Sequence, residues 1–292
     1  MRNSLGVYTS MPRKSLLFTA ILLILTGCAA KMRKPLPICP GKESVAEALV
    51  ALQLQSLNMT SLYAKGKSRL QYYDDKGKKH KENLTIRFSV KSSDEIYLRG
   101  DMSIVPKAVI LGTNKNEFWL AVKPKEISTY WWGTWSELDS SEGLLINPKT
   151  LLEALGITKI DIGADWSLSN EGPFDILTQR DKGMVVKKIY ISCCDYCTRK
   201  IEHFNTDGRI LARVEMEEYK NVTEKFSVPS RIVVTTFGGD KKEDSFSIKF
   251  DFDSIRQQEF TEKQSSLFEP FPRQGFKYVL KLVNGRWVEQ SQ

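Results

Sequence analysis

The sequence has few of the residues on which most enzymes depend. Among 292 residues there are two histidines, His80 and His203. Neither lies in a metal-ligand spacing of the HExxH kind or beside a nucleophile motif. There is no GxSxG sequence, no phosphate-binding loop and no dinucleotide-binding glycine pattern. These absences predict a protein that is not an enzyme and that holds neither a cofactor nor a metal.

The sequence also lacks an N-terminal apolar run long enough to span a bilayer. Residues 16–25 form an apolar run of ten residues, whereas a membrane-spanning helix needs about 20. Arg13 and Lys14 precede the run, and the small residues Thr26 and Gly27 follow it. A basic region, an apolar region and a small-residue cleavage site together are typical of an export signal. Residues 1–27 are therefore predicted to be a signal peptide, with Met11 as an alternative start.

The motif Leu25-Thr26-Gly27-Cys28 resembles a bacterial lipobox, the signal for attaching lipid to a cysteine. The resemblance implies that the mature chain begins at Cys28 with three acyl chains, which anchor a protein far more firmly than one chain. Ala29 stands where the enterobacterial sorting rule has Asp for retention in the inner membrane. The resemblance therefore implies an outer-membrane anchor with the body on the periplasmic side. The alternative is an ordinary signal peptide with a cysteine nearby by chance.

The mature chain has only a modest charge excess. Removing residues 1–27 takes away three basic residues and no acidic one, so the net charge falls from +8 to +5. No nucleic-acid-binding motif accompanies this charge, and no nucleic-acid partner is expected. Lysines gather around Gly77, where they predict a solvated hairpin tip; attraction to anionic lipid head groups is the alternative.

Residues 31–40 are polar and rich in proline, which predicts that residues 28–42 form a lipidated tether. Residues 43–292 are predicted to form a single domain. Val45, Leu49, Leu52 and Leu57 recur at helical spacing and predict a helix that ends near Asn58.

The chain beyond this helix reads as strands and turns. Strands are predicted at residues 61–73, 83–90, 95–102, 105–112, 117–122, 174–179, 185–193, 200–204, 210–219, 231–237, 245–252 and 276–283. Turns are predicted at residues 74–77 and 205–208. Asn147 as N-cap and Gly156 as the C-terminal stop delimit a second short helix. Many short strands in succession favour an antiparallel meander.

Cys39, Cys193, Cys194 and Cys197 are the cysteines that remain after Cys28. In an oxidising periplasm an even number predicts two disulfides, with Cys39 tying the start of the body to the 193–197 corner. Four cysteines allow three pairings. A metal site of Cys194, Cys197 and His203 and a redox pair of Cys194 and Cys197 are the alternatives.

Large aromatic side chains crowd one stretch of the chain. They are Phe118, Trp119, Trp131, Trp132 and Trp135. Such a cluster predicts the wall of an apolar groove or a membrane-interface patch. Ordinary packing within a curved sheet is the alternative.

The layout as a whole resembles the superfamily of LolA, LolB and related outer-membrane lipoproteins. A lipobox and a short helix precede Tyr63-Ala64-Lys65-Gly66-Lys67, and a meander then reaches Glu117-Phe118-Trp119-Leu120. A proline-capped helix follows, and the chain ends with Leu267-Phe268-Glu269-Pro270-Phe271-Pro272 and an apolar strand. The resemblance implies a mainly β fold with short helices: a strongly curved antiparallel half-barrel with helices covering its open side.

The resemblance also implies a function. The concave face of such a fold is apolar and receives acyl chains or lipoproteins, in lipoprotein localisation or envelope assembly. A groove of this kind gains about 0.8 kcal/mol for each lipid CH₂ it buries and needs no catalytic residue. A periplasmic sensor or interaction module that binds a protein partner is the alternative. An enzyme such as a hydrolase is disfavoured, because no nucleophile–base set is visible.

Overall fold

The structure, a computed structural model, describes residues 36–73, 77–124, 127–138, 148–157, 160–237 and 245–290. The predicted signal peptide, Cys28, Ala29, most of the tether and Asn147 lie outside these ranges. Residues Ile38–Gln292 form one compact unit, so a chain of residues 29–292 contains that unit whole. No helix in the described ranges has both the length and the apolar character needed to cross a membrane.

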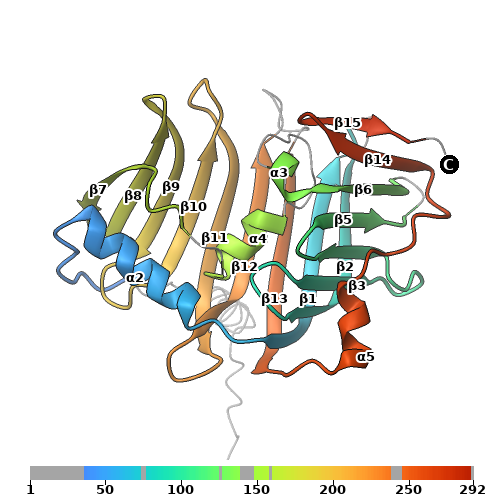
Figure 1. The fold of residues 1–292 in the computed structure, drawn as a ribbon, viewed down its shortest axis with the longest axis horizontal. Helices are drawn as coiled ribbons and strands as arrows, with labels where there is room; N and C mark the ends of the chain where they lie inside the picture. Colours follow the sequence, from blue (N-terminus) through green and yellow to red (C-terminus); the bar gives the residue numbers. More distant parts are fainter. Residues whose placement is uncertain are drawn as a thin grey trace, which may run out of the picture. The chain divides into compact units, whose positions relative to one another are not determined.

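A single curved sheet of fifteen strands runs through this unit (Figure 1). The strand order is β15-β14-β6-β5-β4-β3-β2-β1-β13-β12-β11-β10-β9-β8-β7, so β15 and β7 form its two edges. Every neighbouring pair is antiparallel except β14 and β6, which are parallel. The strands are β1 Leu62–Tyr73, β2 Lys79–Val90, β3 Ile96–Asp101, β4 Val109–Thr113, β5 Glu117–Val122, β6 Thr129–Thr134, β7 Asp165–Glu171, β8 Phe174–Asp181, β9 Met184–Ser192, β10 Thr198–Phe204, β11 Ile210–Asn221, β12 Ser227–Phe237, β13 Ser245–Gln257, β14 Tyr278–Val283 and β15 Arg286–Glu289.

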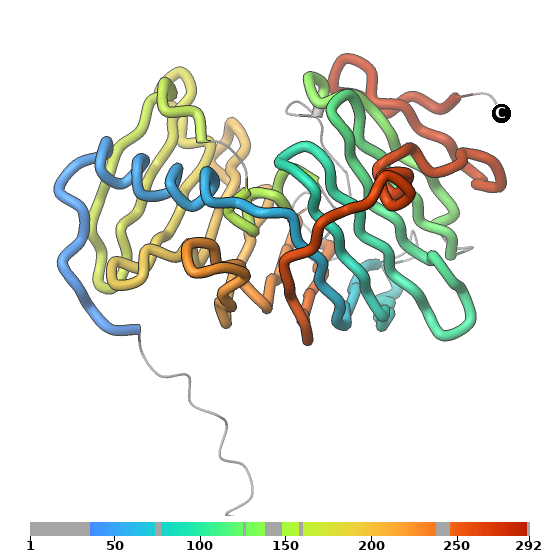
Figure 2. Tube along the Cα trace, turned by 60° about the horizontal axis from the view of Figure 1, so that its bottom comes forward, coloured from blue at the N-terminus to red at the C-terminus, as the bar shows by residue number. Residues whose placement is uncertain are grey.

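Short helices connect and cover the strands. They are α2 Val45–Leu57, α3 Trp135–Leu138, α4 Pro148–Ala154 and α5 Glu262–Ser265, and a 3₁₀ turn, Ser266–Phe268, continues α5. Helix α2 begins where the Ser44 hydroxyl accepts the Glu47 N–H, 3.2 Å away. It ends at Asn58, close to the predicted position. Figures 1 and 2 both show α2 running across strands at the β7 end of the sheet.

Strand alternation gives the sheet two different faces. In β1 the even-numbered residues Leu62, Ala64 and Leu70 are buried, whereas Lys65 and Lys67 are exposed. The buried residues join one apolar core with the helices. The side of the sheet that packs against α2 and α4 is called the inner face here, and the opposite side the outer face. The predicted fold class, a mainly β curved sheet with short helices, is confirmed.

Some predicted strand limits were wrong. The strand predicted at residues 105–112 begins only at Val109, because the chain turns before it: Met102 N–H donates to the Val105 carbonyl, and Lys107 has a φ of 53°. Strands β6, β7 and β15 were not predicted. The turn at 205–208 is confirmed, with Gly208 at a φ of 76°, while the turn at 74–77 lies largely outside the described residues.

Candidate functional site

The inner face is apolar over most of the sheet. Its core combines residues of the central strands, such as Phe88, Phe250 and Phe252, with residues from both ends of the strand order, such as Leu120 and Ile189. No second sheet covers this face in the described part of the chain. The cover consists of α2 and α4, which bury their own apolar side chains against it. The inner face is therefore the largest apolar surface of the fold, and short helices occupy it.

Helix α4 lies at the centre of the inner face, in front of the strands in Figure 1. It contacts β4 in one half of the sheet and β11 in the other. Leu151 and Leu152 are almost completely buried. Gly156 ends the helix with a φ of 69°, a backbone conformation that suits glycine. Helix α4 therefore fills the concavity that the curvature of the sheet creates.

A buried carboxylate ties α4 to the sheet. Glu153 accepts from Lys187 Nζ of β9 at 2.7 Å and lies 3.2 Å from His203 Nε2 of β10. Burial alone would raise the pKa of Glu153, but Lys187 and His203 together hold that pKa well below its usual range. The Glu153 carboxylate therefore holds α4 to β9 and β10 by electrostatic attraction. His203 is part of this contact.

The five aromatic residues predicted to line one groove lie on two different faces. Phe118, Trp131 and Trp135 pack against the core of the inner face. Trp119 and Trp132 belong to a separate apolar cluster on the outer face. The prediction of a single wall was wrong, because residues next to each other in a strand point to opposite sides of the sheet.

The outer aromatic cluster is covered by the chain's own C-terminal segment. Phe271 and Phe276 pack over Trp119, Tyr130 and Trp132. The ring of Trp119 fits because its neighbour in β4 is glycine: a Cβ on Gly112 would lie 2.3 Å from that ring. The Arg273 guanidinium lies 3.7 Å from the centroid of the Trp132 ring, and this contact closes the cluster. These aromatic residues therefore have a packing role.

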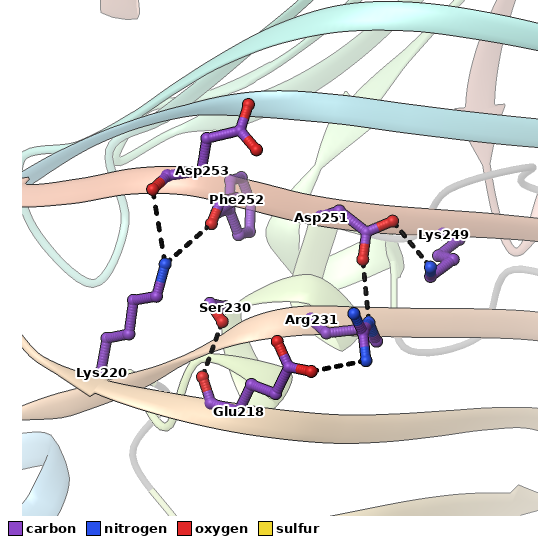
Figure 3. Close-up of a pocket in the computed structure, with 8 residues that line it drawn as sticks. All are labelled: Glu218, Lys220, Ser230, Arg231, Lys249, Asp251, Phe252 and Asp253. Carbon is purple, nitrogen blue, oxygen red and sulfur yellow. Dashed lines mark hydrogen bonds and ion pairs between the residues drawn. The ribbon is translucent and has the colours of Figure 1, made fainter. Parts of the chain in front are cut away.

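Charged side chains cover the outer face of the central strands. Arg231 of β12 contacts Glu218 at 2.7 Å and Asp251 of β13 at 2.9 Å, and Lys249 contacts Asp251 at 2.7 Å. These residues line a polar hollow of about 410 Å³. Figure 3 shows the pairs together with Lys220, which donates to the Phe252 carbonyl. Burial alone would raise the pKa of Asp251, but Lys249 and Arg231 lower it. Because these charges neutralise one another, the hollow offers little to a charged ligand.

The cysteines form one disulfide, between Cys39 and Cys194. Cys193 and Cys197 are free thiols, so the predicted second bridge is absent. The predicted tie between the start of the body and the 193–197 corner is present. The alternative metal set of Cys194, Cys197 and His203 is not assembled: among the described residues, the one group of three candidate ligands is Cys39, Cys193 and Cys194.

Comparisons with known proteins identify the fold and nothing narrower. No family model and no curated relative matches the chain. A domain whose name assigns it to outer membrane lipoprotein sorting, from Vibrio parahaemolyticus, has a similar structure, with a TM-score of 0.50 and 11% identity over 76% of this chain and 94% of that one. A DUF1329 family protein from Desulfovibrio piger has a TM-score of 0.50 and 10% identity over 78% and 98%. A LolA superfamily protein from Nitrosomonas europaea has a TM-score of 0.46 and 12% identity over 76% and 97%. The two structures with a TM-score of 0.50 therefore show that the chain shares its fold with a lipoprotein-sorting domain and a DUF1329 protein, and they show the fold alone.

Proposed function

We propose that this chain is a lipoprotein anchored to the periplasmic side of the outer membrane through Cys28, and that its inner face binds acyl chains or lipoproteins. It acts in lipoprotein localisation or envelope assembly, and the binding of lipid by its inner face involves no catalysis. The anchor hypothesis rests on the Leu25-Thr26-Gly27-Cys28 motif. The binding hypothesis rests on the fold.

One observation carries the binding hypothesis: within the residues that the structure describes, the apolar inner face of an unclosed sheet is covered by short helices and not by a second sheet. Helix α2 contributes only three buried residues to that cover: Ala48, Leu49 and Leu52. An incomplete barrel covered in this way becomes a groove when its cover moves.

The apolar burial of α2 can be compared with that of a lipid. Leu49 and Leu52 together contribute roughly 3–6 kcal/mol through their burial, at about 1.5–3 kcal/mol for each leucine. A 16-carbon acyl chain with about 14 methylenes gains roughly 11 kcal/mol when it is buried, at about 0.8 kcal/mol for each CH₂. The apolar burial available to one acyl chain is therefore larger than that of the two α2 leucines it would replace.

Direct labelling tests the binding site. A photoreactive palmitate analogue is added to purified residues 29–292, crosslinked and located by peptide mass spectrometry. We expect one analogue per chain, attached to inner-face residues of the strands that α2 covers, β7 and β8, and competed away by unlabelled palmitate. Labelling confined to the outer face, or labelling that palmitate does not compete away, would contradict acyl binding by the inner face.

A substitution on the far side of α2 provides the matched control. Leu54 is exposed on this helix and makes no part of the buried core. Leu54→Gln should leave labelling of the inner face unchanged, because the acyl chain enters beneath the helix. A loss of labelling in this variant would move the lipid site to the outside of α2.

The anchor has its own test. Cys28→Ser removes the sulfur that accepts the lipid, and we expect the variant in the soluble fraction, whereas the unaltered chain stays with the outer membrane. Cys197→Ser is the control, because Cys197 is a free and buried thiol inside the body. That control should remain with the membrane. A Cys28→Ser variant that still sediments with the membrane would argue against the anchor.

A second candidate function, binding of a protein partner, is favoured by the outward side of α2. Val50, Leu54 and Leu57 are all more than half exposed and recur at helical spacing. An exposed apolar stripe of this kind is typical of a protein-binding surface. The Leu54→Gln variant separates the two functions. It should weaken the binding of a protein partner to this stripe and leave the binding of lipid to the inner face unchanged.

A further inference from the structure

Three sulfur atoms meet where the N-terminal end of the body crosses strands β8 and β9. The Sγ atoms of Cys39, Cys193 and Cys194 all lie within 4.8 Å of one another. Cys39 and Cys194 form the disulfide, so Cys193 is a free thiol directly beside an existing bridge. A thiol in this position is the arrangement that thiol–disulfide exchange requires.

The backbone holds the Cys193 sulfur in place. The Cys39 N–H donates to Cys193 Sγ at 3.0 Å, and the Cys193 N–H donates to the Pro173 carbonyl at 3.0 Å. The turn that carries Cys193 and Cys194 is closed by Ser192 N–H donating to the Cys197 carbonyl, also at 3.0 Å. The free thiol is therefore positioned by main-chain contacts on both sides of it.

The segment that carries Cys39 is fixed as firmly. Lys42 N–H donates to Asp175 Oδ2 of β8 at 2.9 Å. Gly41 passes so close to this carboxylate that a Cβ there would lie 2.1 Å from Asp175 Oδ1. The Lys42 ammonium lies 5.2 Å from the centroid of the Tyr196 ring. These contacts keep Cys39 beside both neighbouring cysteines, whichever of them it is bonded to.

Cys197 takes no part in this cluster. It is buried, and burial, with the nearby Asp195 carboxylate, raises its pKa to about 11. The sequence-based alternative of a redox pair between Cys194 and Cys197 is therefore replaced by a different set of sulfur atoms.

We propose that Cys39, Cys193 and Cys194 form a thiol–disulfide exchange site whose substrate is an external disulfide. The Cys193 thiolate attacks Cys39 Sγ, the Cys39–Cys194 bond breaks, and a Cys39–Cys193 bond forms. The Cys194 thiolate leaves, and the proton lost by Cys193 returns to it through solvent. No oxidant or reductant is consumed, since one disulfide replaces another.

The exchange changes which sulfur faces solvent as a free thiol. Cys193 is half-buried, whereas Cys194 is exposed. Once released, the Cys194 thiolate attacks an external disulfide, forms a mixed disulfide with one half of it and expels the other half as a thiolate. This inference does not depend on acyl binding by the inner face.

Oxidised glutathione is a suitable probe. Residues 29–292 are treated with it, the remaining thiols are blocked, and fragment-ion mass spectrometry locates glutathione at Cys193 or Cys194. We expect glutathione on Cys194 with a Cys39–Cys193 bridge, although the resting bridge is Cys39–Cys194. The rate should rise with pH, because the thiolate is the attacking species. Glutathione on Cys193 alone, or on neither cysteine, would overturn the proposal.

Matched variants separate exchange from direct reaction. Cys193→Ser should keep the Cys39–Cys194 bridge and lose labelling at Cys194. Cys194→Ser should form a Cys39–Cys193 bridge and take up no glutathione at either position. Cys197→Ser should react as the unaltered chain does. A Cys194→Ser variant in which Cys39 and Cys193 both stay reduced would also overturn the proposal.

A second probe distinguishes the two sources of an external disulfide. A peptide dimer joined by one disulfide is offered in place of oxidised glutathione. If both probes react, the substrates of the site include disulfides of peptides and proteins as well as of small molecules. If glutathione alone reacts, the substrates are small-molecule disulfides only.

Discussion

Replacing Gly66 by alanine is expected to cost more than about 4 kcal/mol of the free energy of unfolding, or to prevent folding altogether. Gly66 lies in β1 next to an irregularity in its pairing with β13. A Cβ at this position would lie 2.0 Å from the Asp251 carbonyl oxygen and 2.7 Å from Phe252 Cα. Both atoms belong to backbone, so neither can rotate away as a flexible side chain would.

The expected damage is large because of where the clash falls. Strands β1 and β13 are neighbours near the middle of the fifteen-strand order. Moving β13 away from Gly66 would disturb Asp251 on the outer face, where it pairs with Arg231, and Phe252 in the inner core. One methyl group therefore acts on the pairing, the core and an ion pair together.

Gly100→Ala is the matched control. Gly100 is also a buried strand glycine, in β3, but a Cβ there would come no closer than 3.4 Å, to a Leu84 methyl group. We expect a change in stability within about 1 kcal/mol, because alanine also reduces the entropy of the unfolded chain. Urea unfolding followed by fluorescence measures both variants. If Gly66→Ala and Gly100→Ala had the same urea midpoint of unfolding, the backbone of β13 would have to move at little energetic cost, which would contradict this prediction.

Replacing Glu153 by glutamine is expected to lower the free energy of unfolding by about 3 kcal/mol. The loss of the carboxylate leaves Lys187 partly buried without its counter-charge and removes the negative charge beside His203. Glu215→Gln is the control, because Glu215 is exposed on β11. This substitution should change the free energy of unfolding by no more than about 0.5 kcal/mol. Adding Lys187→Met to Glu153→Gln should restore part of the loss, since it removes the uncompensated charge.

The same variant has a predicted pH dependence. The pKa of Glu153 in the folded protein lies below the ordinary carboxyl value of 4.5. The carboxylate therefore contributes its full stabilisation above about pH 4.5, and this contribution is lost as the pH falls below that value. The difference in stability between the unaltered chain and Glu153→Gln should be smaller at pH 3 than at pH 6. A difference that grows in acid would contradict this account of the group.

Local sequence patterns were enough to predict most strands. In residues 84–88 apolar residues alternate with polar ones, because one side of β2 faces the core and the other faces solvent. Strand β6 lacks this signal, since Tyr130, Trp131 and Gly133 are all buried and both of its faces are covered. Edge strand β7 also gives a weak signal, but for a different reason. None of its residues is fully buried, so no side of the strand is marked by a run of buried apolar residues.

The residues of the candidate sites were harder to predict, because they come from distant parts of the chain. Cys39 and Cys194 are 155 residues apart, and their pairing depends on the route of the whole sheet between them. Glu153 carries no motif, and its partners Lys187 and His203 are identified only once α4 lies against β9 and β10. No local pattern distinguishes Cys193 from Cys197 as the neighbour of the bridge.

The sequence alone determined most of the strands, the position of helix α2 and the lipobox-like motif, because each depends on residues close together in the chain. Only the tertiary structure decided that Trp119 and Trp132 face away from Phe118 and Trp131, that α4 fills the inner face, and that three sulfur atoms meet at Cys39. The physical reason is the same in each case. Side-chain direction alternates along a strand, and contacts between distant strands depend on the order and curvature of the whole sheet.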